Sequence, residues 1–117
     1  MHTYKTQLRQ VLANHGWEVT EVVQPDDWWA DEFWKLESRK NAWGLPLVLT
    51  FLVDPMWDAP RKPGQGIWAI IATDQVPADR LSAEPGIAKL YLAKGRFDKN
   101  VLEFVTALDT YRNCGKA

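Results

Sequence analysis

The residues of this chain whose type and position could support chemistry are few, and Asp54 is the first of them. It directly follows an apolar run, Leu45 to Val53, and precedes Pro55 and a long loop. A carboxylate at a strand end beside a long loop has a frequent catalytic placement, but an aspartate before proline is also a common turn starter. No histidine, serine or second carboxylate stands at a spacing that strengthens the catalytic alternative. His15 has no partner nearby in the sequence, so we expect it to serve the end of a helix.

A second acidic set gives an alternative of another class. Pro25-Asp26 is followed by Glu37-Ser38-Arg39-Lys40, which resembles the proline-aspartate and glutamate-x-lysine elements of metal-dependent nucleases. Such enzymes hold magnesium with clustered carboxylates and use the lysine to support the attacking water. Here Arg39 stands where that lysine belongs, and Lys40 comes one place late. The alternative function is therefore a small metal-dependent hydrolase or nuclease-like enzyme that uses Asp26, Glu37 and Asp54. The preferred interpretation assigns no catalytic residue, metal or cofactor.

Tryptophan is the unusual residue of the composition, because the chain has seven and six of them lie between Trp28 and Trp68. A core of this size rarely needs so many large rings, and each indole N–H seeks a hydrogen-bond partner or water. Clustered tryptophan indicates an interface or a pocket, and the alternative is a bulky core. The loop from 54 to 66 adds two cations that could bind an anion or stack on a ring. The candidate contact residues are Trp28, Trp29, Trp43, Trp57, Arg61 and Lys62.

Length and composition bound the class of protein. The chain has 117 residues, of which 46% are hydrophobic and 25% charged, and these values are typical of one globular domain. A net charge of -1 argues against a nucleic-acid binder. One cysteine, Cys114, excludes an intrachain disulfide and fits a cytoplasmic setting. We expect neither a secretory signal at the start nor a membrane span, since the longest apolar run has the length of a strand.

Hydrophobic periodicity predicts a helix at each end of the chain. Residues 3–15 carry apolar side chains at helical spacing, and Gly16 suits the position after a helix, where positive φ is wanted. The second helix is expected from Asp98, as its cap, to about Tyr111. Asp26 and Asp27 could cap a short helical turn through Ala30, or this segment could be an irregular crossing loop.

Alternating side chains predict strands at 17–23, 33–39, 45–53, 67–73 and 87–93. The connections between residues 33 and 73 suit antiparallel pairing. We therefore expect a single α+β domain over residues 1–117, a two-layer fold with a mainly antiparallel sheet of about five strands, an N-terminal helix and a C-terminal helix. The long 54–66 loop joins the two central strands and is a candidate for function.

The two central strands are predicted to be apolar on both faces, which is typical of a strand covered on both sides. In this pattern Trp68 shares a face with Ile70 and Ala72, and Phe33 shares a mostly wet face with Lys35 and Glu37. Two helices can cover only one face of the sheet. The second face needs a cover from the tryptophan segments, from a second copy of the chain, or from curling of the sheet.

These observations favour a non-catalytic binding or protein-interaction domain. Its expected contact surface is the tryptophan-rich surface together with the 54–66 loop, and its expected partner is a second copy of the chain or another protein.

Overall fold

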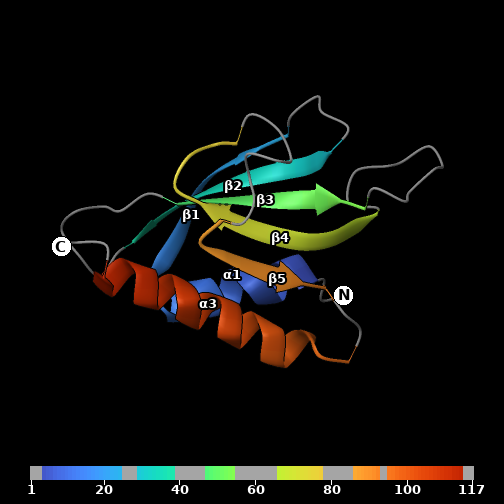
Figure 1. Ribbon diagram of the computed structural model, residues 1–117. Helices are drawn as coiled ribbons and strands as arrows, with labels where there is room; N and C mark the ends of the chain where they lie inside the picture. Colours follow the sequence, from blue (N-terminus) through green and yellow to red (C-terminus); the bar gives the residue numbers. More distant parts are fainter. Residues whose placement is uncertain are drawn as a thin grey trace.

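The computed structural model has the α+β architecture that the sequence predicts. It describes residues 4–24, 29–38, 47–54, 66–77, 86–92 and 95–114. Within these ranges the elements are α1 (Tyr4–Asn14), β1 (Trp17–Val23), β2 (Ala30–Ser38), β3 (Leu47–Val53), β4 (Ile67–Thr73), β5 (Ala88–Tyr91) and α3 (Phe97–Cys114). Both helices lie on the same face of the sheet (Figure 1).

The five strands form one antiparallel meander in the order β1-β2-β3-β4-β5, so every strand pairs with its neighbours in the chain. The predicted antiparallel pairing is confirmed. Strands β1 and β5 are the edges of the described sheet, and β3 is its centre. Gly16 has a φ of 83°, which confirms the positive φ predicted for it, and α1 ends at Asn14, one residue earlier than predicted.

The main core fills the space between the sheet and the two helices. From the helices it takes Leu8 and Leu12 of α1 together with the apolar stripe of α3. From the sheet it takes the side chains that point toward the helices. These buried strand residues are Trp17, Trp34, Leu36, Leu47, Leu49, Phe51, Ile70, Ala72 and Leu90.

A second core lies on the opposite face of the sheet, as the apolar pattern of the central strands requires. Its buried residues are Trp29, Ala30, Phe33, Val48, Leu52, Ala69 and Ile71, and all of them are at most 6% exposed in the isolated chain. Trp29 is one of the rings predicted to cover this face. Trp28 and Trp57, the other two predicted covers, lie outside the described residues.

Two expectations about faces are wrong, and the β-bulges explain one of them. The register of β3 and β4 shifts between Leu52 and Val53, so Ile67 packs in the main core and Trp68 packs against the second core. One extra residue in a strand reverses the face of everything before it. Phe33 does not lie on a solvent-exposed face, since it is 4% exposed and belongs to the second core.

The ends of several elements differ from the predicted ones. β2 begins at Ala30 rather than at Phe33, so Ala30 lies in a strand and not in a helical turn. β5 is shorter than predicted, and α3 extends past Tyr111 to Cys114. The predicted starts of β3 at Leu45 and the end of β5 at Ala93 fall outside the described residues.

Candidate functional site

Three of the nine predicted site residues lie in the described part of the chain: Trp29, Glu37 and Asp54. The other six, Asp26, Trp28, Trp43, Trp57, Arg61 and Lys62, lie outside it.

Trp29 is a core residue of the second face. Its indole is 4% exposed, and its ring meets the Phe33 ring edge-on at a centroid distance of 6.0 Å. Its carbonyl accepts a hydrogen bond from the amide of Val53 at 2.9 Å, which extends the pairing of β2 with β3 by one residue. A partner could reach this ring only after a local rearrangement.

The structure does not bring Glu37 and Asp54 together. Glu37 is exposed near the end of β2, where it pairs with Glu18, whereas Asp54 follows the last residue of β3. The two strands are antiparallel, so these acids stand at opposite ends of the sheet, roughly 20 Å or more apart at about 3.3 Å per residue. The described residues contain no group of three or more His, Cys, Asp or Glu side chains that could hold a metal ion.

Asp54 instead marks the base of the long loop. Its amide donates a hydrogen bond of 2.7 Å to the carbonyl of Gly66, the residue that leads into β4. The loop between them therefore leaves and rejoins the sheet at the same place, two residues before Trp68 of β4.

An aromatic and cationic patch lies beside this loop base, and we call Trp68, Lys89 and Tyr91 the edge patch. The ammonium of Lys89 lies 4.6 Å from the centre of the Trp68 ring and 5.2 Å from that of Tyr91. The two rings are 5.6 Å apart between centroids, and Tyr91 is 49% exposed. A cation over ring faces stiffens the arrangement, and an exposed ring in a stiff setting suits a contact surface.

A buried ionic cluster joins α1 to the beginning of β2. Asp31 and Glu32 are 7% and 6% exposed, and the Lys5 ammonium lies 3.5 Å from Asp31 Oδ2 and 3.0 Å from Glu32 Oε1. Consecutive residues of a regular strand face opposite ways, but the register shift between Ala30 and Phe33 lets both carboxylates meet the same lysine. Trp34 Nε1 donates a hydrogen bond to Glu32 at 2.7 Å. The cluster therefore connects α1 to the sheet, and we call it the helix-to-sheet lock.

The same cluster perturbs Tyr4, whose hydroxyl is buried and has no hydrogen-bond partner in the described structure. Burial raises the pKa of this phenol, and the charges of Asp31 and Glu32 raise it further. A pKa that is higher in the folded state gives a contribution to stability that is complete below the unfolded pKa of about 10 and is lost as the pH rises above it.

Replacing Tyr4 with phenylalanine is expected to leave the free energy of unfolding at neutral pH unchanged or to raise it by about 1 kcal/mol, since the change removes an unsatisfied hydroxyl. The ring contacts with Phe97 and Phe51 would remain. Urea unfolding between pH 7 and pH 11 should show a smaller alkaline loss in Y4F than in the parent. Tyr91→Phe, at an exposed ring, is the control and should keep the parental loss. A neutral-pH loss above 1 kcal/mol in Y4F would show that the hydroxyl has a partner.

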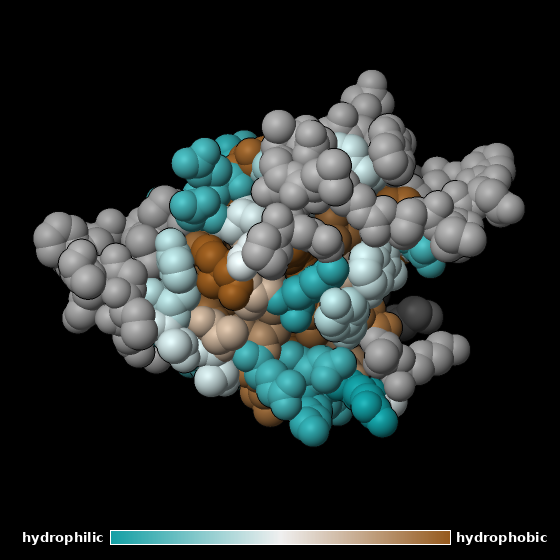
Figure 2. Space-filling view, viewed as in Figure 1, coloured by the Kyte–Doolittle hydropathy of each residue, from teal (hydrophilic) through white to brown (hydrophobic). Residues whose placement is uncertain are grey.

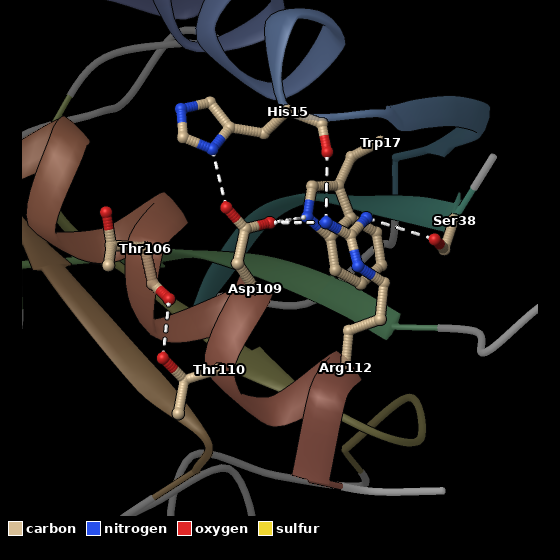
Figure 3. A network of polar contacts seen from close by, with 7 residues as sticks. All are labelled: His15, Trp17, Ser38, Thr106, Asp109, Thr110 and Arg112. Atoms are coloured by element: carbon tan, nitrogen blue, oxygen red, sulfur yellow. Dashed lines mark hydrogen bonds and ion pairs between the residues drawn. The ribbon is translucent and has the colours of Figure 1, made fainter. Parts of the chain in front are cut away.

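A polar network lies at the opposite end of the helical layer, and we call it the Asp109 network (Figure 3). Asp109 accepts hydrogen bonds from Trp17 Nε1 at 3.0 Å and from Arg112 at 2.8 Å, and its other oxygen lies 2.5 Å from Nδ1 of His15. Arg112 also donates to the His15 carbonyl at 3.1 Å and to Ser38 Oγ at 3.0 Å. Its guanidinium lies 4.7 Å from the centre of the Trp17 ring.

This network contains the residue types of a hydrolase triad, but their geometry is different. Figure 3 shows the guanidinium of Arg112 between Ser38 and Asp109, while the imidazole of His15 meets Asp109 from the other side. A triad needs the serine hydroxyl against the histidine and the carboxylate behind it. The network therefore ties the ends of α1, β1, β2 and α3 together, and it assembles no activated nucleophile.

Sequence reasoning missed the partner of His15 because Asp109 is 94 residues away. A signal was present in α3, where Arg112 continues the spacing of Val101, Val105 and Leu108. An arginine on an apolar helical stripe needs a buried acceptor, and Asp109 at i−3 supplies one.

Comparison with known proteins adds nothing to this geometry. No protein-family model, no curated protein and no solved structure matches the chain. Within the described residues, neither helix has both the length and the apolar content that crossing a lipid bilayer requires.

Proposed function

We propose that this chain is a non-catalytic protein-binding domain whose contact surface combines the edge patch with the 54–66 loop. The observation that carries the proposal is the position of the edge patch. Trp68 and Tyr91 lie where the loop rejoins the sheet, and Tyr91 is half exposed. Exposed aromatic rings beside a long loop are typical of interaction surfaces.

The positive charges of this surface indicate the chemistry of its partner. The loop contributes Arg61 and Lys62 from its sequence, and the edge patch contributes Lys89. We infer a partner surface with acidic residues around an apolar or aromatic centre. Trp57, Trp43 and Trp28 are further contact candidates. Trp29 remains a candidate as well, although its burial at 4% exposure requires a rearrangement for contact.

The arrangement of the described polar groups favours binding over catalysis. The carboxylates of the Lys5 cluster and of the Asp109 network are engaged with lysine, arginine, tryptophan and histidine side chains. Such pairing serves stability, whereas a catalytic acid or base needs a place for substrate beside it. The separation of Glu37 from Asp54 also gives no support to a shared metal between these two acids.

The proposal is tested by isolating partners of the full chain from its source cells and measuring their affinity for purified variants. Tyr91→Ala and Trp57→Ala are each expected to weaken a true partner by at least tenfold, since exposed aromatic anchors carry much of the binding energy. Thr106→Ala, at an exposed site on α3, is the matched control and should bind like the parent. Equal affinity of all variants would place the contact elsewhere.

A metal titration separates this proposal from the enzyme alternative. Magnesium or manganese at millimolar concentration should leave the melting temperature unchanged for a binding domain. A ligand specific for the folded state raises it, so a clear metal-dependent increase would favour the hydrolase with Asp26, Glu37 and Asp54.

A second copy of the chain is one partner that this surface would accept. Light scattering at high concentration then gives twice the monomer mass of 13.4 kDa. A mass of one chain at all concentrations would exclude the homodimer and leave another protein as the partner.

A further inference from the structure

An open groove runs between the outer edge of β5 and α3. Its volume is about 390 Å³. The strand side contributes Ile87, Ala88, Lys89 and Tyr91, and the helix side contributes Asn100, Glu103, Phe104 and Ala107. Figure 2 shows a group of hydrophilic residues, in teal, over the amino-terminal part of α3.

The hydrogen-bonding pattern of β5 determines which of its backbone groups face the groove. The amide of Leu92 donates to the carbonyl of Trp68 at 3.1 Å, so this pair bonds toward β4. In an antiparallel ladder the next residue along points its backbone groups the other way. Tyr91 therefore directs its amide and carbonyl toward α3, and Asn100 Nδ2 reaches that carbonyl at 3.3 Å.

The hydrogen bond from Asn100 to Tyr91 indicates which chemical group this edge of β5 can bind. A side-chain amide from the helix makes the hydrogen bond that the N–H of a neighbouring strand would make, but its length of 3.3 Å is just beyond the usual range of about 2.7–3.2 Å. An incoming backbone N–H could replace it with a shorter and better aligned bond. Strand addition of this kind uses main-chain bonds for affinity and pockets for alternate side chains for specificity.

The side chains of the groove add a charge pattern and an apolar floor. Phe104 is 3% exposed, and Ala107 and Ala88 are small, so the floor of the groove is apolar and is formed partly by small side chains. Glu103 is exposed on the helix wall, whereas the ammonium of Lys89 on the strand wall lies over the rings of Trp68 and Tyr91. An occupant with a basic side chain toward Glu103 and an apolar side chain toward Phe104 is complementary to these walls.

We propose that this groove binds an extended segment of a partner protein, which adds to β5 as a sixth strand. β5 has four residues, so at about 3.3 Å per residue roughly 13 Å of partner backbone can pair with it. The groove shares Lys89 and Tyr91 with the edge patch. The strand pairing itself uses the backbone edge of β5 and the lining of α3, and it needs neither the 54–66 loop nor the tryptophan rings.

The test uses a displayed library of random ten-residue peptides selected on the full-length chain, followed by titration of the enriched synthetic peptides. Ala107→Trp fills the groove and should weaken these peptides at least tenfold. Thr106→Trp places the same ring one residue away, at an exposed site outside the groove lining, and should bind like the parent. Glu103→Lys, which changes only surface charge, should weaken peptides that carry a basic residue by at least fivefold.

Backbone pairing has its own readout. Methylating alternate peptide nitrogens should abolish binding in one phase and leave it intact in the other, because only every second N–H faces β5. Tolerance of methylation in both phases, equal affinity for A107W, or the enrichment of no peptide would overturn the proposal. A parental dimer that A107W dissociates would also overturn it, since the occupant would then be a second copy. Trp57→Ala should leave peptide binding unchanged. A failure of the groove proposal can therefore be distinguished from a failure of the proposed contact surface.

Discussion

Replacing Asp109 with alanine is expected to lower the free energy of unfolding by about 3 kcal/mol. The change removes the acceptor for Trp17, His15 and Arg112 at once, and Arg112 is only 5% exposed. Breaking a buried ion pair by removing one partner costs about 3–5 kcal/mol, because the remaining charge stays in a poor solvent. We expect the lower end of that range, since the side chain of Asp109 is 22% exposed and water can partly replace it.

Urea unfolding of D109A measures this loss, with Glu103→Ala as an exposed acidic control on the same helix that should stay within about 0.5 kcal/mol of the parent. A second substitution sharpens the result. In D109A/R112M the guanidinium is absent, so the double variant should be less destabilised than the sum of the two single variants. Strict additivity, or a loss below 1 kcal/mol in D109A, would show that the Asp109 network does not act as a unit.

Replacing Trp29 with alanine should be the most damaging single change on the second face of the sheet. The ring is 4% exposed and packs on Phe33, so its removal leaves a cavity in a small core. Large aromatic side chains replaced by alanine in a core cost about 3–5 kcal/mol. Thermal or urea unfolding should therefore show a loss of about 3 kcal/mol or more.

Tyr91→Ala is the matched control for Trp29→Ala. Tyr91 is 49% exposed, so its removal should change stability by less than about 1 kcal/mol. A Trp29→Ala variant as stable as Tyr91→Ala would contradict the second core. It would also support the prediction that Trp29 is a contact residue for a partner.

Local patterns were enough to predict the layers of this fold. The period of the side chains distinguished the terminal helices from the strands, and the short connections between strands predicted antiparallel pairing. Leu47, Leu49 and Phe51 on one face, with Val48 and Leu52 on the other, required two cores, and the structure has both. These features depend on neighbours in the chain, where geometry is set by spacing alone.

The β-bulges could not be predicted from the spacing of side chains. A bulge depends on how two strands meet, and no single strand carries a mark for it. The shift near Leu52 moved Trp68 to the second face, and the shift after Ala30 turned both Asp31 and Glu32 toward Lys5. The edge patch and the helix-to-sheet lock both follow from these two displacements.

Local spacing along the chain was sufficient to predict the two helices, the five strands and the need for cover on both faces of the sheet, because hydrophobic burial acts on the period of side chains. The contact of His15 with Asp109 and the distance between Glu37 and Asp54 became known from the folded chain. Contacts between residues distant in the chain depend on register and on the crossing of layers, and neither quantity is written in local spacing.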